Sequence, residues 1–435
     1  MGIRTGAAYL AALRDDREIW IDGERVGDVT ADRRFASAAR AVAALYDMQH
    51  APDLRARMTY ASPTTGVPVG LSFIQPASID DLVARREMVK TWNDSTCGML
   101  GRSPDYMNIM LTGFASANLA FGEKDKRFAD NVLNYYLHVR ENDLTMTHTL
   151  VNPQVDRSRP VEQQAKDLAA KIVRETSEGI VITGARMVST LAAFSDDILV
   201  MPSTYISDSP DAAPYAFGFS VKVGSPGLRF ICRPSVSHLE AASPMDWPLS
   251  LRFDEADAMA VFDDVLVPWE RVFIYRDVEV HNTIYARTGA RSALSHQFIT
   301  KDLAKAEFMM ALAFTLARTT KVDGFLHIEG LLAEHINNVE VIRACILAAE
   351  TEAKVSPHGI VVPADGPLNA VRFLFPQMFR RACESIQIIG AGGLVMVPSF
   401  AELDGPMAEV VATYCQAAGA DSRERIKLFR LAFDA

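Results

Sequence analysis

The hydrophobic pattern of this chain changes its period twice, and the order of these changes constrains the fold. Apolar residues recur at three- and four-residue steps near the N-terminus, alternate as strands do in the middle, and then return to helical spacing in longer segments. The clearest late stripe is typical of a long bundle helix. Its members are Ile328, Leu332, Ile336, Val339, Ile342, Ile346 and Ala349.

A chain of 435 residues exceeds the size of a single hydrophobic core. We therefore predict an α+β multidomain protein with boundaries where the pattern changes. A mainly helical N-terminal domain is expected over residues 1–150, a middle β-barrel or β-sandwich domain over 151–275, and a C-terminal four-helix bundle over 276–435.

Several local elements are expected within this plan. Residues 18–26 alternate around Asp22-Gly23 as a hairpin does, and residues 179–190 resemble a β-run folded about a glycine turn. Pro376 predicts a kink or break in a late helix. Helices are expected over residues 7–16, 37–46, 79–92, 109–121, 127–139, 165–176 and 303–317.

Charge and cysteine content exclude some classes of protein. The net charge is −10 without a block of Lys or Arg, so nucleic acids and anionic membranes are poor candidate partners. We find neither an apolar N-terminal segment of signal-peptide length nor a run of about 18 apolar residues. Five scattered cysteines favour a reducing cytoplasm. His327 and His335 lack the partners of a metal site, so no metal is expected.

Candidate chemistry gathers between Cys97 and Arg157, where two turn-like segments flank two helical ones. Arg102, Tyr106 and His148 offer a fixed cation, a phenol and an imidazole, which together suit the binding and polarisation of a hydroxylated aromatic ring. Spacing alone leaves open that each is a surface or packing residue.

Six sequence strings, spread in order along the chain, carry a resemblance to a known family. They are RTGAAYLAALRDDREIWIDGERVGDVT, YASPTTGVPVG, GMLGRSPDYMN, HTLVNPQVDR, FDDVLVPWERVF and IGAGGLVMVPS. These strings resemble the 4-hydroxyphenylacetate 3-monooxygenase family, the oxygenase components of two-component phenol hydroxylases. The resemblance implies an acyl-CoA dehydrogenase-like architecture.

The activity implied by the resemblance is FADH2-dependent aromatic hydroxylation through a flavin C4a-hydroperoxide. A separate NAD(P)H:flavin reductase would supply FADH2, and O2 would oxidise a phenol to its catechol. The phenol stays open among 4-hydroxyphenylacetate, a halogenated or nitrated phenol, and a tyrosine-derived intermediate, as does the preference for FADH2 over FMNH2. The family also implies a homotetramer built as a dimer of dimers.

Site residues follow from the same resemblance. Arg102, Tyr106 and His148 would be catalytic and contact the substrate hydroxyl, and Ser203 and Thr204 would lie near the substrate. The glycine segment near residue 390 would be a loop at the adenine end of a flavin, although a helix C-cap is equally consistent with it. The flavin contacts would come from His148, Thr149, Leu150, Gln154, Val155, Asp156, Arg157, Ser189, Thr190, Gly390, Gly392 and Gly393, with the choice between Ser189 and Thr190 open.

Three alternatives to this interpretation make demands that the sequence can be compared with. An acyl-CoA dehydrogenase-like enzyme acting on a thioester needs a carboxylate base in the pocket, which the sequence does not identify. A dehydratase with an iron–sulfur cluster needs further cysteines beyond Cys97, where Gly101 and Asp302 stand instead. A degenerate structural homologue is disfavoured because Arg102, Tyr106 and His148 occur together.

The family's flavin-contacting tail would extend beyond Ala435, and without it we expect weaker FAD binding.

Overall fold

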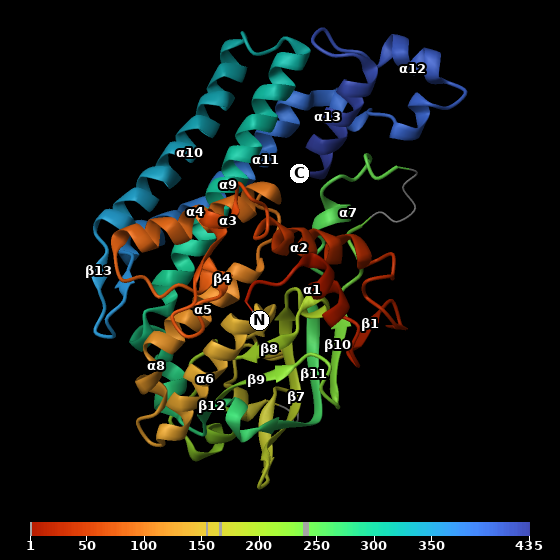
Figure 1. Cartoon of the computed structure of the whole chain (residues 1–435). Coiled ribbons are helices and arrows are strands. Elements are labelled where there is room, and N and C mark those ends of the chain that lie inside the picture. The colour runs from red at the N-terminus through yellow and green to blue at the C-terminus, as the bar shows by residue number, and fades with distance from the viewer. Residues whose placement is uncertain (1, 154, 165–167, 238–242) are drawn as a thin grey trace.

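The N-terminal part of the chain is mostly helical in the computed structural model, which describes residues 2–153, 155–164, 168–237 and 243–435 (Figure 1). The helices expected over residues 79–92 and 127–139 are confirmed as α4 and α6. A short hairpin, β3 (Thr59–Ala61) and β4 (Pro68–Gly70), lies between the helices. The helices are α1 (Gly6–Ala12), α2 (Ala36–Met48), α3 (Arg55–Met58), α4 (Ile79–Ser95), α5 (Pro104–Ser116) and α6 (Lys126–Asn142).

Two sheets form the middle of the molecule. The first has the order β2-β1-β10-β11-β7-β6 and the second the order β12-β9-β8-β5. The predicted hairpin at residues 18–26 is confirmed, and its first strand pairs in parallel with β10, so the N-terminal segment completes the first sheet. The strands are β1 (Glu18–Ile21), β2 (Glu24–Val26), β5 (Met146–Thr149), β6 (Lys171–Glu175), β7 (Gly179–Ser189), β8 (Asp197–Val200), β9 (Phe217–Lys222), β10 (Leu228–Cys232), β11 (Ala258–Pro268) and β12 (Val272–Tyr275).

Three long helices dominate the C-terminal part and pack on one another in Figure 1. The first of them, α9, also packs against α4 and α5, so the bundle is joined to the N-terminal helices. This arrangement confirms the α+β multidomain prediction. The helices are α8 (Val278–Thr288), α9 (Ala290–Thr320), α10 (Leu326–Thr351), α11 (Asp365–Val395), α12 (Ala408–Tyr414) and α13 (Ser422–Asp434), after a short α7 (Ser250–Phe253) and beside the small hairpin β13 (Lys354–Val355) and β14 (Val361–Val362).

Three local predictions were wrong. The helix expected over 165–176 is not formed, because residues 171–175 pair with β7 as strand β6, and residues 165–167 lie outside the described part. Residues 179–189 form a single strand, since Gly184 pairs with Phe262 beside an irregularity of the ladder and does not turn the chain back. Helix α11 runs through Pro376, and its non-helical residue is Ala391.

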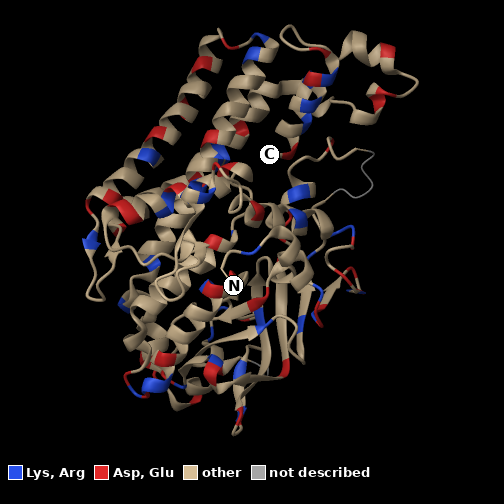
Figure 2. Ribbon diagram, viewed as in Figure 1, with Lys and Arg blue, Asp and Glu red and all other residues tan. Residues whose placement is uncertain are grey.

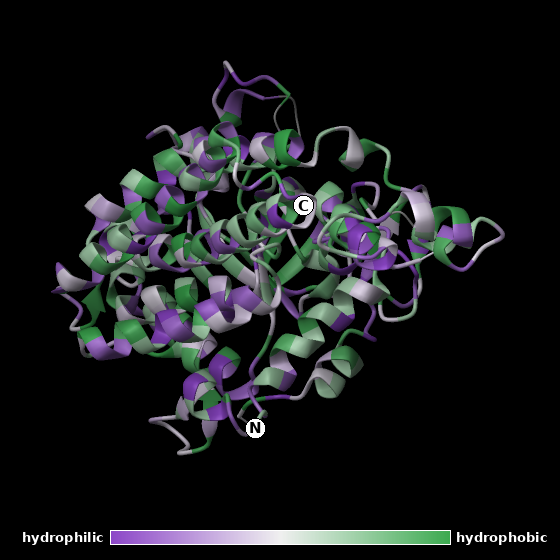
Figure 3. Cartoon of the chain, turned by 90° about the horizontal axis from the view of Figure 1, so that it is seen from above, coloured by the Kyte–Doolittle hydropathy of each residue, from purple (hydrophilic) through white to green (hydrophobic). Residues whose placement is uncertain are grey.

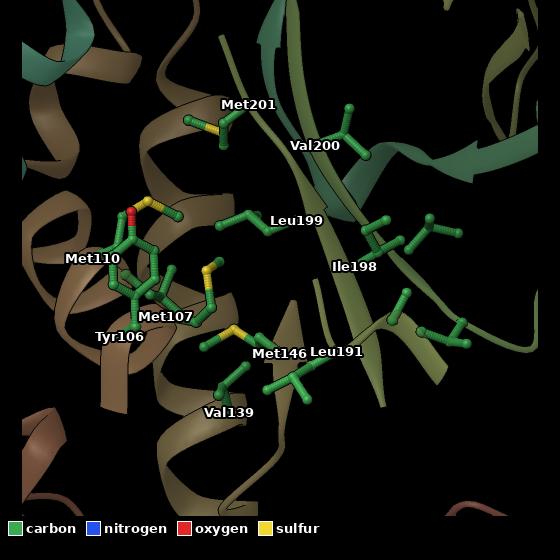
Figure 4. Close-up of a cluster of buried hydrophobic side chains, with 14 of the residues drawn as sticks. Tyr106, Met107, Met110, Val139, Met146, Leu191, Ile198, Leu199, Val200 and Met201 are labelled. Atoms are coloured by element: carbon green, nitrogen blue, oxygen red, sulfur yellow. The ribbon is translucent and has the colours of Figure 1, made fainter. Parts of the chain in front are cut away.

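The core that supports the candidate site lies between α5, α6 and the second sheet. Figure 4 shows Tyr106, Met107 and Met110 on the helix side and Leu199 and Met201 on the strand side of one buried cluster. Charged residues of both signs are interspersed over the helices and loops in the view of Figure 2. Among the described residues, no helix is long and apolar enough to cross a membrane.

Candidate active site

The three candidate catalytic residues come from two elements that pack together. Arg102 lies just before α5, where Pro104 occupies the first turn and fixes the start of the helix. Tyr106 therefore belongs to the helix, and His148 belongs to strand β5, although both were expected in turns. His148 pairs with Leu199 of β8, and α5 packs against β5. The fold thus brings together residues 46 positions apart.

Arg102 contacts both of the other candidates. Its Nε donates a hydrogen bond to His148 Nε2 at 3.1 Å, and its guanidinium carbon lies 4.3 Å from the centroid of the Tyr106 ring. The rings of Tyr106 and His148 are 5.6 Å apart between centroids. Because Nε2 accepts this bond, the neutral imidazole carries its proton on Nδ1, a buried atom without a partner among the described residues.

Burial keeps His148 uncharged. Its side chain is 6% exposed, and desolvation, followed by the nearby Arg102 charge, lowers the pKa of His148 to about 3. An imidazole that is neutral across the physiological range has a lone pair to receive a proton. His148 is therefore neutral and presents its Nε2 lone pair as a hydrogen-bond acceptor.

This depressed pKa predicts a specific dependence of stability on pH. The unfolded chain protonates His148 near 6.5, but the folded chain does so only near 3. The free energy of unfolding should therefore fall as pH decreases through this window, by up to about 1.4 kcal/mol per pH unit. Urea unfolding of the wild type and of His148→Asn between these pH values measures the difference, and parallel curves for the two proteins would contradict the assigned pKa.

A carboxylate that sequence reasoning missed supports Arg102. Glu255 Oε1 accepts a hydrogen bond from the backbone N–H of Arg102 at 2.8 Å, across 153 residues of sequence. Burial raises the pKa of Glu255 to about 7, and the Arg102 bond opposes this rise. Gly101 permits the approach, since a Cβ there would lie 3.3 Å from Glu255 Oε2. Glu255 lies in the acidic segment 254–257, and because such segments are usually solvated, its sequence context does not indicate a buried partner.

The segment after His148 lies against β7. Thr149 Oγ1 donates to the Met187 carbonyl oxygen at 3.3 Å. Two neighbouring hydroxyls at the end of β7 differ in their partners. Thr190 Oγ1 donates to Asp257 Oδ1 at 2.7 Å, whereas Ser189 Oγ is buried and has no partner in the described part of the chain. Ser189 is therefore the hydroxyl free to bind a ligand.

An open cavity of about 280 Å³ is lined by residues from both the predicted flavin segment and the predicted substrate segment. Asp156 and Arg157 belong to the flavin segment, and Thr204 belongs to the substrate segment. Ser203 is brought close as well, because its hydroxyl donates to the Leu150 carbonyl oxygen. Val155 is exposed, and Gln154 lies outside the described residues.

The glycine segment near residue 390 is not a loop, as was expected, but part of α11. Gly390, Gly392 and Gly393 lie around Ala391, whose backbone φ of 44° interrupts the helix. Gly393 abuts α13, and a Cβ there would lie 3.1 Å from the Phe429 ring. Among the described residues, the main contacts of α11 are with α9, α10 and α13, and no extensive contact joins it to β5, which carries His148.

The described residues contain no group of three or more His, Cys, Asp or Glu side chains arranged to hold a metal ion. His335 on α10 instead has a structural partner, because its Nε2 lies 2.6 Å from Ser385 Oγ in the bundle interior. Cys97 is a free thiol whose pKa is raised by burial.

Comparison with known proteins adds sequence and structural relatives. Residues 5–274 match a family model described as 4-hydroxyphenylacetate 3-hydroxylase N terminal, and residues 281–435 match the corresponding C terminal model. The chain is 40% identical to the 4-hydroxyphenylacetate 3-monooxygenase oxygenase component of Thermus thermophilus, over 99% of this chain and 88% of that protein.

Solved structures also match this chain over nearly its whole length. A crystal structure of the oxygenase component of 4-hydroxyphenylacetate 3-monooxygenase complexed with FAD and 4-hydroxyphenylacetate matches with a TM-score of 0.94 and 40% identity, covering 99% of this chain and 89% of that one. A 4-hydroxybutyryl-CoA dehydratase from N. maritimus matches with a TM-score of 0.88 at 22% identity, over 99% of this chain and 85% of that one, and shares the fold.

Proposed function

The chain belongs to the 4-hydroxyphenylacetate 3-hydroxylase family, and we propose that it hydroxylates a para-substituted phenol, such as 4-hydroxyphenylacetate, ortho to the phenolic hydroxyl. It is the oxygenase component of a flavin-dependent monooxygenase. Its cofactor is FAD in the reduced form, and a separate reductase is its partner. We propose that this partner is an NAD(P)H:flavin reductase.

The hydrogen bond between Arg102 and His148, beside Tyr106, carries this proposal. A phenol whose hydroxyl takes the place of Arg102 Nε would donate a hydrogen bond to the lone pair of His148 Nε2, which would accept or share the phenolic proton. The Arg102 guanidinium would then stabilise the phenolate, and Tyr106 would donate a hydrogen bond to it. Ionisation makes the ortho carbon nucleophilic, and Glu255 holds the backbone that places Arg102.

The residues beside the phenol site fit a flavin. Ser189 Oγ and Asn152 Oδ1 are buried without a partner in the described part of the chain, and Asn152, Asp156 and Arg157 line the open cavity. Reduced FAD, when bound there, supplies the activated oxygen for the reaction. Ser189, Thr149 and the backbone of residues 150–153 and 155–157 would hold the ring.

We further propose a homotetramer, a dimer of dimers, in the cytoplasm. Large apolar side chains are exposed on the long helices, which Figure 3 shows from above, and they include Leu347 on α10 at 63% and Phe373 on α11 at 72%. In such an assembly, the glycines around Ala391 would contact a flavin bound by a neighbouring subunit. The free thiols of all five cysteines support a reducing compartment.

The assembly predicts a measurable mass. Light scattering behind size exclusion should give about four times the chain mass of 47.8 kDa. Leu347→Lys and Phe373→Lys together should yield smaller species, because charges replace apolar contacts, whereas Lys126→Gln on α6 should leave the mass unchanged. A wild-type monomer would refute the tetramer without affecting the chemistry.

The reaction itself is tested by product analysis. The protein is supplied with O2, NADH, FAD and a flavin reductase, and a panel of para-substituted phenols is searched for catechols by mass spectrometry. We expect a catechol from at least one phenol, with one oxygen atom derived from O2. Absence of every catechol, together with oxidation of an acyl thioester in a parallel panel, would replace this proposal by the dehydrogenase alternative.

A further inference from the structure

A buried polar pair lies in the contact between helix α5, which carries Tyr106, and helix α9 of the bundle. Gln297 Nε2 on α9 donates a hydrogen bond to Asp105 Oδ2 on α5 at 2.7 Å. Asp105 is 0% exposed and Gln297 is 1% exposed. Asp105 lies between Arg102 and Tyr106 in the sequence, so the pair attaches the end of α5 at the proposed phenol site to the bundle.

The two helices approach each other closely further along this contact. A Cβ on Gly113 of α5 would lie 2.9 Å from the Ala290 Cα of α9. Asp105 precedes Gly113 by about two turns and Gln297 follows Ala290 by about two turns, so the helices run antiparallel and the polar pair forms a second contact point. Such a pair fixes how the helices align, because each buried polar atom needs a matching partner.

An ionised Asp105 leaves this pair incomplete. Asp105 Oδ1 and Gln297 Oε1 are both buried, and both lack a partner among the described residues. Each is an acceptor, so neither can satisfy the other while the carboxyl group is ionised. A proton on Asp105 Oδ1 changes this, because the acid O–H can donate to Gln297 Oε1 while Oδ2 still accepts from Nε2. One hydrogen atom thus satisfies two buried acceptors.

No charge compensates an ionised Asp105. Burial raises the pKa of Asp105 from an ordinary 3.8 to about 6, against the opposing effects of the Ser103 hydroxyl, the Gln297 amide and the backbone N–H of Asp105. No charged or titratable side chain of the described residues acts on this pKa. A hydrogen bond donated by the acid proton would stabilise the neutral form further. Burial and hydrogen-bond geometry therefore favour the same protonation state.

We propose that Asp105 is a positioning residue, which pairs as a protonated acid with Gln297 through two hydrogen bonds and thereby holds the first turn of α5 against α9. This turn carries Tyr106 and begins just after Arg102, so the pair keeps both residues in contact with His148. A neutral acid does so without an unpaired charge in the interior. The positioning role rests on the proposed function, whereas the protonation of the pair can be measured without substrate.

The first experiment detects the proton on Asp105. The infrared difference spectrum between the wild type and Asp105→Asn should contain the carbonyl band of one protonated carboxyl group at a pH of about 5, which lies between the ordinary and the raised pKa. The same difference taken with Asp130→Asn, at an exposed position of α6, should contain no such band. Absence of the band from the Asp105→Asn difference would overturn the proposal.

The pH dependence of stability is a second measure of the same proton. Because the pKa of Asp105 is higher in the folded chain than in the unfolded one, its stabilisation is complete below pH 3.8 and is lost as the pH rises through about 6. The folded-to-unfolded ratio of the wild type, divided by that of Asp105→Asn, should fall across this range by up to about tenfold per pH unit. The contribution of His148 is common to both proteins and cancels. A quotient independent of pH would contradict the proposal.

The positioning role is tested by kinetics with 4-hydroxyphenylacetate. Gln297→Leu removes both hydrogen bonds at similar size, so the KM for the phenol should rise by about 3- to 10-fold and less catechol should form per FADH2 oxidised. Oxidation of FADH2 by O2 should keep its rate. Asp105→Asn keeps both hydrogen bonds, because its amide N–H replaces the acid O–H, and its KM should stay within about twofold of the wild type. Gln416→Leu makes the control exchange at an exposed residue after α12.

The outcomes separate this inference from the proposed function. A Gln297→Leu protein with the wild-type KM and catechol yield would show that the pair does not position the site, and the proposal would be wrong. If Gln297→Leu does not fold, the infrared band, the pH dependence and the retained yield of Asp105→Asn decide the proposal. If the wild type forms no catechol from any phenol, the proposed function fails and the positioning role fails with it, while the two measurements without substrate still decide the protonation of Asp105.

Discussion

His148→Asn should lower the rate of catechol formation by at least about 100-fold while FADH2 is still oxidised by O2. The substitution removes the lone pair that Nε2 presents to the phenolic proton, yet an amide of similar size can still accept a hydrogen bond from Arg102 Nε. The phenol then stays protonated, and its ortho carbon is a poor nucleophile. Catechol yield by chromatography, measured beside O2 consumption, gives the ratio of product to oxidised flavin.

A matched control lies on the neighbouring helix. His138 on α6 is exposed, and His138→Asn should retain the wild-type yield because this side chain is remote from Arg102. A second arm raises the pH, which ionises the free phenol in solution and should restore part of the activity of His148→Asn. A variant that keeps the wild-type yield at neutral pH would remove His148 from its assigned role.

Gly184→Ala should destabilise the protein by at least about 3 kcal/mol. Gly184 has a backbone φ of 115°, a region that residues with a Cβ rarely adopt, and an added Cβ would lie 2.4 Å from the Ala169 carbonyl oxygen. The clashing atoms are backbone atoms of Ala169 and Ala170, and they cannot yield without breaking the hydrogen bonds of this segment to Ala185 of β7. Urea unfolding followed by tryptophan fluorescence measures the loss.

The same exchange at another position serves as its control. Gly330 lies inside α10, where an added Cβ would meet no atom within 4 Å, so Gly330→Ala should stabilise the protein by about 0.5–1 kcal/mol. Strand β7, which contains Gly184, also carries Ser189. A Gly184→Ala protein with wild-type stability would show that the backbone conformation at Gly184 is not required by the fold.

Elements with a strong internal period were predictable from sequence. The stripe from Ile328 to Ala349 specified α10, and the alternation around Asp22-Gly23 specified the first hairpin, because local chemistry decides both. Residues 171–175 were missed because pairing with β7, a distant partner, outweighs their helical composition. Pro376 was expected to break a helix, but α11 continues through it because α9, α10 and α13 pack against this helix. The interruption lies at Ala391 instead.

The candidate site was predictable only in part. The resemblance named Arg102, Tyr106 and His148, and the fold places them in contact, while their catalytic roles remain proposals. Glu255 was missed, since it acts through a contact with a segment far away in the sequence, at Arg102. It carries no local motif, so only the folded arrangement indicates its function.

The most direct test of the account mixes the protein, loaded with FADH2 and 4-hydroxyphenylacetate, with buffer containing labelled O2 in a single turnover. We expect nearly one catechol per flavin, carrying one labelled oxygen atom, and a yield close to zero for His148→Asn at the same rate of FADH2 consumption. Quantitative release of hydrogen peroxide by the wild type, with no labelled catechol from this or any other para-substituted phenol, would contradict the account.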